Sequence, residues 1–378
     1  MTARALIEVL LHVGATGMKV NAASLRNCAS AGPVPRQRTC MAVREAPAVV
    51  AILRAAMQAI LAVTIPFFAL VLCGYLAARR HVLPESAIPG LNSFVLYFAL
   101  PCLLFRFGSS TPLLELLNPA LLLVYVASAL LIVFFTIAFS LNPRVGLQDA
   151  SFGALVAAFP NTGFMGVPLL VALLGPAAAG PVICSMLADL FITSSLCIAL
   201  AQAHSAAQHG ARTAALRALR GALSNPLPWS IALGAGFGAA GLALPGPLRA
   251  IVNMLADAAT PVALFTIGAV LFRAGQHAQH RTPLQDYVPV ALIKLLLHPL
   301  LVLLLGLAAQ RLGAPLTHFQ ITAVTLGAAL PSASNVSLLA ERYGADNGRI
   351  ARIIMTSTVL AFVSFSALAW VFGVQRAD

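Results

Sequence analysis

The chain has 378 residues, of which 60% are hydrophobic and 9% are charged, and its mean hydropathy is +0.92. Soluble domains carry about 25% charged residues, so this composition excludes an ordinary soluble protein and predicts an all-α polytopic membrane protein. The formal net charge of +12 would favour a nucleic-acid partner in a soluble chain. Here the arginines lie mostly in short linkers and are not interleaved with aromatic residues, so we predict no nucleic-acid binding.

The sequence carries few marks of catalysis or metal binding. Its six cysteines are scattered without a CxxC pair, which argues against a disulfide framework and against a metal site. The nucleophile motif GxSxG, the phosphate-binding motif GxxxxGKS/T and the zinc motif HExxH are absent. We therefore predict no catalytic residue, no metal and no cofactor.

Residues 1–56 do not fit the pattern of a membrane fold. They contain Lys19 and six arginines, and the apolar stretch 6–13 is too short for a membrane span. Met57 then opens the first long apolar segment. We expect residues 1–56 to be an N-terminal extension that is either disordered or a non-native start of the reading frame, and we favour a natural start near Met57.

Ten apolar segments follow, each close to the length of about 20 residues that a helix needs to cross a bilayer. They lie at 58–78, 87–107, 118–140, 150–173, 178–202, 226–244, 248–272, 287–309, 317–340 and 349–373. We predict two five-helix repeats, at 57–203 and 226–378, joined by the linker 204–225. In this linker ALRALRGAL has leucines on one helical face and arginines on the other, which predicts an amphipathic segment on the cytoplasmic leaflet.

Positive charge is divided unequally between alternate linkers. The linkers after the odd-numbered helices hold eleven arginines: Arg79, Arg80, Arg144, Arg212, Arg217, Arg220, Arg273, Arg281, Arg342, Arg349 and Arg352. The other linkers and the C-terminus hold four, namely Arg106, Arg249, Arg311 and Arg376. The positive-inside rule then places the first set in the cytoplasm and both termini outside, which an even number of helices allows.

Helix-breaking residues interrupt the segments 150–173 and 317–340. In the first, PNTG consists of Pro160, Asn161, Thr162 and Gly163; in the second, PSASN contains Pro331, Ser332, Ser334 and Asn335. Proline removes a backbone donor and crowds the preceding turn. Free backbone groups at membrane depth are tolerated only where protein or water meets them. We therefore predict an unwound centre in each of these two helices.

The two halves of the chain repeat these features. Pro101 lies mid-span nine residues after Asn92, and Pro261 lies mid-span eight residues after Asn253. Because five helices is an odd number, the second copy enters the membrane from the opposite side. We therefore predict inverted repeats, with broken helices 4 and 9 crossing and with helix breaks at Pro101, Pro160, Pro261 and Pro331.

Paired broken segments at matching places indicate the binding site of a transporter. The half-helices beside each break direct partial positive and negative charges at its centre. We predict a small polar substrate site near the bilayer midplane, built from Asn161, Thr162, Gly163, Ser332, Ser334 and Asn335. The alternative is that the prolines only kink the helices and help them to pack.

Two motifs, PNTGFMGVPL and LPSASNVSLLAERYG, resemble those of the auxin efflux carrier family of transporters, whose bacterial members include proteins named malonate transporters. FFALVLCGYLAARRHVLP and YFALPCLLF are similar to the family's opening, and the resemblance covers about residues 57–374. It implies ten helices in two inverted repeats, a scaffold part, a mobile part that carries organic anions by an elevator-type movement, and a homodimer. The short linker 204–225 resembles bacterial members, which implies the bacterial inner membrane.

Four ionisable residues lie inside predicted helices: Asp189, Asp257, Lys294 and His298. A charge at the bilayer centre is costly, so each is a functional candidate. Lys294 and His298 are four residues apart on one helical face, and we expect them to pair with Asp189 or Asp257, or to hold a carboxylate. Either aspartate is a candidate for a coupling proton, and the alternative is an Asp–Lys pair that only fixes helix packing. Arg106 is expected to extend to the membrane interface.

Three functions compete at this point. The leading prediction is a secondary transporter of small organic anions with proton or sodium coupling, and malonate is preferred on resemblance alone. A cation/proton antiporter shares the inverted repeats, but neither broken segment contains the acid that such antiporters place at the crossing. An intramembrane aspartyl protease would use Asp189 and Asp257 as a pair sharing a proton, but the sequence around each does not fit.

Overall fold

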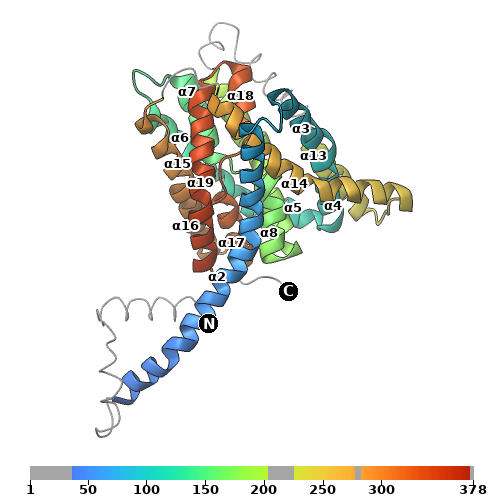
Figure 1. Cartoon of the computed structure of the whole chain (residues 1–378). Helices are drawn as coiled ribbons and strands as arrows, with labels where there is room; N and C mark the ends of the chain where they lie inside the picture. Colours follow the sequence, from blue (N-terminus) through green and yellow to red (C-terminus); the bar gives the residue numbers. More distant parts are fainter. Residues whose placement is uncertain (1–35, 203–224, 277–281, 375–378) are drawn as a thin grey trace.

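The structure, a computed structural model, describes residues 36–202, 225–276 and 282–374, and within these ranges all regular elements are helical (Figure 1). Seven of the described helices are long and apolar enough to cross a membrane. They are Met57–Arg79, Glu85–Ser110, Pro119–Ser140, Pro176–Ala201, Gly246–Arg273, Val288–Arg311 and Asn347–Val371. The chain is therefore an all-helical polytopic membrane protein, as its composition predicts.

Four of these spans are built on single helices, and three contain a wider π-helical turn. The single helices are α2 (Arg36–Arg79), α6 (Pro119–Ser140), α14 (Gly246–Gln276) and α19 (Asn347–Val371). The composite spans are α3–η3–α4 (Ile88–Phe94, Val95–Ala99, Leu100–Ser110), α9–η6–α10 (Ala179–Ala188, Asp189–Thr193, Ser194–Ala201) and α15–η8–α16 (Val288–Leu292, Ile293–Leu297, His298–Arg311). Single π-helical turns inside helices often occur at functional sites.

The other three predicted segments are shorter or interrupted. The segment at 226–244 contains α13 (Pro226–Ala239). The segment at 150–173 contains α7 (Leu147–Ala158), the π-helical turn η4 (Thr162–Gly166) and α8 (Val167–Leu174). The segment at 317–340 contains α17 (His318–Ala328) and α18 (Val336–Tyr343). Short elements complete the described chain: η2 (Glu85–Ala87), α5 (Leu113–Leu116), η5 (Pro176–Ala178) and η7 (Leu284–Asp286).

The predicted helix breaks at Pro101 and Pro261 are wrong. Helix α14 continues through Pro261. Pro101 lies in the first turn of α4, directly after the π-helical turn Val95–Ala99, and the Leu100 N–H donates to the Val95 carbonyl. A wider turn before a proline removes the clash with the preceding carbonyl, so the span continues with one hydrogen bond fewer.

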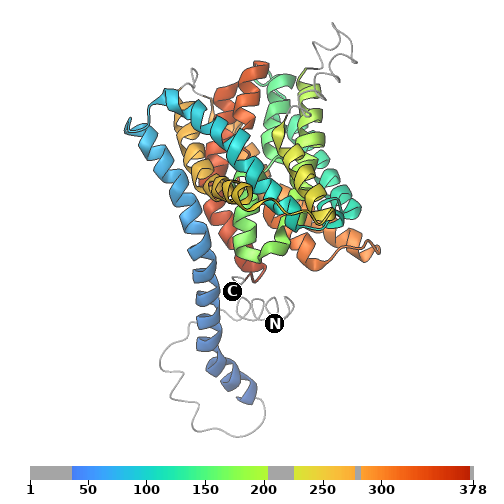
Figure 2. The same ribbon diagram turned by 90° about the vertical axis from the view of Figure 1, so that its right-hand side faces the viewer.

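Helix α2 begins at Arg36, so residues 36–56 are helical and continuous with the first span. The alternative of a non-native start before Met57 stays a prediction. Figures 1 and 2 show this part of α2 extending beyond the helical bundle. Residues 1–35 and 203–224, which include nearly all of the predicted amphipathic linker, lie outside the described residues.

Glycines bring the helices of one part of the bundle into backbone contact. A Cβ atom at Gly74 of α2 would meet the Phe265 carbonyl oxygen of α14, and one at Gly268 of α14 would meet the Val71 carbonyl oxygen of α2. Helices α4 and α13 meet in the same way through Gly234. Small residues allow such close approach between helices in membranes, where van der Waals packing drives association. Helix α4 also packs against α14, so α2, α4, α13 and α14 form one group, which we call the glycine-packed group.

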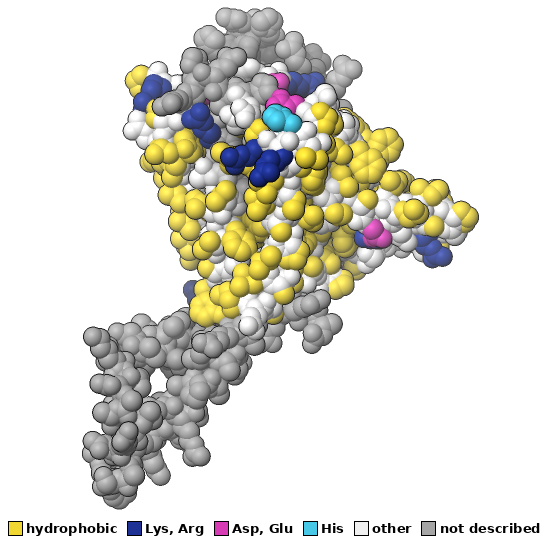
Figure 3. Space-filling view, in the orientation of Figure 1, with side chains coloured by type: hydrophobic (Ala, Val, Ile, Leu, Met, Phe, Trp, Pro, Cys, Tyr) yellow, Lys and Arg dark blue, Asp and Glu magenta, His cyan; other side chains and the backbone are white. Residues whose placement is uncertain are grey.

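Charged side chains are distributed unevenly over the face of the molecule drawn in Figure 3. Figure 3 shows Lys and Arg side chains of this face gathered mainly at the end where α3 and α18 lie in Figure 1. This is also the end of Arg79 and Arg273, in linkers that the positive-inside rule assigns to the cytoplasm. The orientation in the membrane stays a prediction.

Candidate functional site

The two interrupted helices meet at their breaks through backbone hydrogen bonds. The Asn161 N–H donates to the Pro331 carbonyl at 2.8 Å, and the Ala333 N–H donates to the Phe159 carbonyl at 3.0 Å. The two segments thus form an isolated antiparallel bridge between helix ends. Backbone groups that lose their helical partners must be paired elsewhere in an apolar environment. Each break therefore satisfies part of the other, and we call this meeting point the crossing.

A third helix, α19, forms hydrogen bonds to the crossing. The Ser332 N–H donates to the Ser357 hydroxyl at 3.2 Å, and the two hydroxyl oxygens are 3.1 Å apart. Ser357 lies on α19 and is fully buried. Sequence reasoning missed this residue, because one serine in an apolar helix carries no pattern that indicates its partner.

All six residues predicted to bind substrate lie in the two breaks, and most of them are buried. Asn161, Thr162, Ser332 and Ser334 are buried, and Gly163 faces α9, where a Cβ would be 3.4 Å from the Met186 sulfur. Two polar atoms of the set, Thr162 Oγ1 and Asn335 Oδ1, are inaccessible and have no hydrogen-bond partner among the described residues. A buried polar atom without a partner is costly. The crossing thus contains two polar side chains that need a partner which the described residues do not supply.

A lysine lies at the end of one half-helix. Helix α17 ends at Ala328, and the Lys294 Nζ donates to the Ala328 carbonyl at 2.6 Å. Lys294 is fully buried and comes from the π-helical turn Ile293–Leu297. The carboxyl end of a helix carries partial negative charge and favours a cation. Lys294 therefore offsets the helix end next to the crossing.

A buried acid lies near this lysine. Asp189, in the π-helical turn Asp189–Thr193, accepts a hydrogen bond from the Tyr125 hydroxyl at 2.7 Å and one from the Thr193 hydroxyl at 3.1 Å. Asp189 and Lys294 interact electrostatically but do not form a direct ion pair. The predicted partnership of these two residues is thus indirect.

His298 joins the lysine to the tyrosine. The Lys294 Nζ is 3.1 Å from His298 Nδ1, and the His298 and Tyr125 rings lie 5.9 Å apart between centroids. His298 is fully buried, and its Nε2 has no hydrogen-bond partner among the described residues. Tyr125, Asp189, Lys294 and His298 form one cluster between α6, η6, η8, α16 and the end of α17, which we call the buried polar cluster. Sequence reasoning missed Tyr125, since its role depends on which helix faces it.

Asp257 does not belong to this cluster. Its carboxylate accepts a 2.7 Å hydrogen bond from Arg106, and the two side chains are 68% and 37% exposed. Of the alternatives that the sequence left open for Lys294, pairing with Asp257 is therefore not the one formed. The interfacial position expected for Arg106 stays a prediction. Asp189 and Asp257 have separate partners, so the carboxylate pair that an aspartyl protease needs is not assembled.

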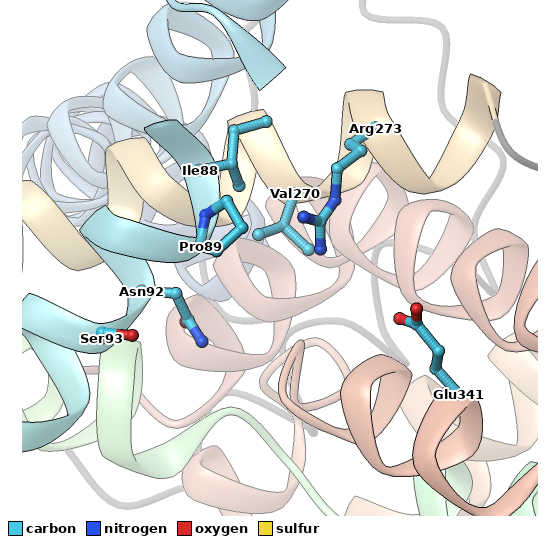
Figure 4. Close-up of a pocket in the computed structure, with 7 residues that line it drawn as sticks. All are labelled: Ile88, Pro89, Asn92, Ser93, Val270, Arg273 and Glu341. Carbon is cyan, nitrogen blue, oxygen red and sulfur yellow. The ribbon is translucent and has the colours of Figure 1, made fainter. Parts of the chain in front are cut away.

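A cavity opens at the end of the molecule where α3 and α18 lie. Its volume is about 320 Å³, and it lies between α3, α14 and α18 (Figure 4). Arg273 and Glu341 are its charged lining residues. Sequence reasoning assigned neither to a site, because only the approach of helix ends distant in sequence brings them together. Within the described residues no group of three or more His, Cys, Asp or Glu side chains is arranged to hold a metal ion.

Residues 59–369 match the family described as membrane transport protein. The chain belongs to this family. The match covers most of the chain and confirms the predicted membership of the auxin efflux carrier family. The interrupted helices and the buried polar cluster of this chain lie inside the matched region.

Three curated relatives have similar lengths to this chain. A protein of Rhizobium meliloti (strain 1021), provisionally named a malonate transporter, is 30% identical over 85% of this chain and 99% of its own. The uncharacterized transporter YfdV of Escherichia coli (strain K12) is 24% identical over 82% of this chain and 95% of its own. An uncharacterized transporter of Methanothermobacter thermautotrophicus is 27% identical over 78% of this chain and 92% of its own.

Proposed function

We propose that the chain is a secondary active transporter that carries small organic carboxylates, malonate among them, across the bacterial inner membrane. Membership of the membrane transport family supports transport itself. The substrate class is supported by the name of the relative that is 30% identical. The chemistry of the crossing supports it independently.

The observation that carries this proposal is the crossing with its two unpartnered polar atoms. Thr162 Oγ1 and Asn335 Oδ1 come from opposite breaks and have no partner among the described residues. A hydroxyl can donate to a carboxylate, and an asparagine amide presents either its oxygen or its NH₂ group, depending on its rotation. The π-helical turn η4, which continues into α8, begins at Thr162, and α18 begins directly after Asn335, so the amino ends of two helical segments lie beside these atoms and favour an anion. A short carboxylate fits this combination of donors.

The proposed transport cycle is an elevator-type movement in two inverted five-helix repeats. We assign the glycine-packed group to the static scaffold, because its backbones are in direct contact. The moving part would contain the crossing together with α6, α9, α16 and α19. Both termini would lie outside, and two chains would form a homodimer.

The buried polar cluster is the proposed site of ion coupling. Asp189 is fully buried, interacts electrostatically with Lys294 and lies one helix away from the crossing. Movement of a proton or a sodium ion to this carboxylate would change the charge of the mobile part by one unit. The same feature keeps a cation/proton antiporter as the second candidate, since such a protein also needs a buried acid.

The test is uptake of radiolabelled malonate into proteoliposomes, with and without an inward proton gradient. Thr162→Val removes one unpartnered hydroxyl at the crossing at constant shape, and we expect it to raise the KM by about tenfold, the value of one hydrogen bond to a charged group. Asn161→Ala is expected to abolish gradient-driven uptake. Thr136→Val is the matched control, because Thr136 is also fully buried with an unpartnered hydroxyl but lies on α6, outside both breaks.

Each result separates the candidates. Uptake that survives in Asn161→Ala and Thr162→Val would keep the substrate and move the site away from the crossing. No malonate uptake by the wild type under any gradient would refute malonate as substrate. Proton release driven by a sodium gradient in the absence of malonate would favour the antiporter.

A further inference from the structure

The cavity between α3, α14 and α18 is separate from the residues of the crossing. It is lined by Ile88, Pro89, Asn92, Ser93, Val270, Arg273 and Glu341. Its volume of about 320 Å³ is near the lower end of the range of small-molecule sites. A site of this size suits a short acid with its hydration water.

Two opposite charges face this cavity from different helices. Figure 4 shows the Arg273 guanidinium on α14 and the Glu341 carboxylate on α18 directed toward the cavity from opposite walls, with the Asn92 amide at its side. Guanidinium binds carboxylate in a planar, two-bonded geometry. An amide NH₂ can add a further donor. One wall therefore attracts an organic anion, and the opposite wall repels it.

The cavity is also connected to the crossing through one helix. Glu341 lies six residues after Asn335 along α18, which corresponds to about 9 Å of helix. Helix α18 belongs to the proposed moving part, whereas α14 belongs to the proposed scaffold and α3 is continuous with its helix α4. The cavity thus lies between the two parts that an elevator movement displaces, at the predicted cytoplasmic end.

We propose that this cavity is a second carboxylate-binding site, an access site where Arg273 and Asn92 bind the substrate before it reaches the crossing. Glu341 competes with this binding from the opposite wall, because its negative charge repels an entering carboxylate. This inference rests on the proposed function as a carboxylate carrier and deepens it by naming the residues that select the anion.

The first test is the concentration dependence of malonate uptake when substrate is presented to the cytoplasmic end in inside-out vesicles. Arg273→Gln should raise the KM by about tenfold or more with little change in Vmax, since it removes a charged hydrogen-bond donor. Arg273→Lys should restore much of the affinity through its charge. Glu341→Gln should lower the KM by about threefold or more, because the competing charge is gone.

Arg342→Gln is the matched control. Arg342 is next to Glu341, is exposed and does not line the cavity, so its removal changes the net charge of this end by one unit without touching the site. We expect its KM to stay within about twofold of the wild type. An Arg273→Gln variant with a wild-type KM, in a protein that Asn161→Ala inactivates, would overturn the access site and leave the proposed function standing.

A second measurement does not depend on transport. Ser93→Cys, in a background without other cysteines, places a thiol at the exposed lining residue Ser93. Malonate should slow the reaction of this thiol with a membrane-impermeant methanethiosulfonate reagent, and Arg273→Gln should remove this protection. Unchanged labelling at saturating malonate would overturn the access site. If the wild type transports no malonate, the proposed substrate fails, and protection of Ser93→Cys alone decides whether the cavity binds a carboxylate.

Discussion

Arg349, at the start of α19, provides the sharpest test of how the proposed moving part is held together. Its side chain is only 2% exposed. Its Nε donates to the Asp286 carbonyl at 2.8 Å, one terminal nitrogen donates to the Asp149 carbonyl at 2.8 Å, and the other donates to the Ser140 hydroxyl at 3.4 Å. One buried guanidinium therefore connects the ends of α6, α7 and α19 with the turn before α15.

We expect Arg349→Met to destabilise the protein strongly. Two well-formed hydrogen bonds from a charged donor contribute roughly 1.5 to 3 kcal/mol each. The variant also ends the desolvation cost of the buried cation, which offsets part of this loss, so the net loss should be about 2 to 4 kcal/mol. At about 2 °C per kcal/mol for a large chain, the apparent Tm should fall by about 4 to 8 °C.

The assay is thermal unfolding of the detergent-solubilised full chain, followed by tryptophan fluorescence. Arg352→Met is the matched control: it is the same change one turn further along α19, at a half-buried residue that donates to the Thr282 carbonyl. Its Tm should fall by less than half as much as that of Arg349→Met. Equal decreases for the two variants would refute the reasoning, because burial and the additional hydrogen bonds would then contribute nothing.

Two further predictions concern the scaffold and the ion coupling. Gly268→Val should prevent folding, because its side chain would meet the Val71 carbonyl, whereas Gly275→Val, with nothing within 4 Å, should yield folded protein by size-exclusion chromatography. The opposite pattern would exclude backbone contact between α2 and α14. Asp189→Asn should abolish the dependence of malonate uptake on the proton gradient, whereas Asp257→Asn should keep it, since an exposed ion pair contributes about 1 kcal/mol or less. Gradient-driven uptake by Asp189→Asn would refute the proposed role of Asp189 in ion coupling.

The prolines of the predicted spans differ in whether they interrupt their helices. Four prolines were expected to break helices, but only the segments around Pro160 and Pro331 are interrupted. The two breaks pair with each other through their backbones, whereas α14 continues through Pro261 although Asp257 and Thr260 precede it. The pairing of two distant segments, which no local pattern shows, therefore distinguishes an interruption from a proline inside a continuous helix.

The ionisable residues show the limit of sequence reasoning. Sequence position alone gave Asp189 and Asp257 equal standing as partners of Lys294. The structure buries Asp189 against Tyr125 and leaves Asp257 exposed beside Arg106. Which of two acids approaches a lysine depends on the rotation and neighbours of each helix, and hydropathy carries no information on either.

By itself, the sequence determined the membrane class, the positions of the apolar spans and the two polar interruptions, because the bilayer imposes length and hydropathy on each segment separately. Its motifs also determined the family. Only the tertiary structure decided that the two breaks pair through their backbones, that Lys294 caps α17, and that Arg273 and Glu341 share a cavity. These contacts join residues distant along the chain, so they depend on how helices pack against one another and not on any local pattern.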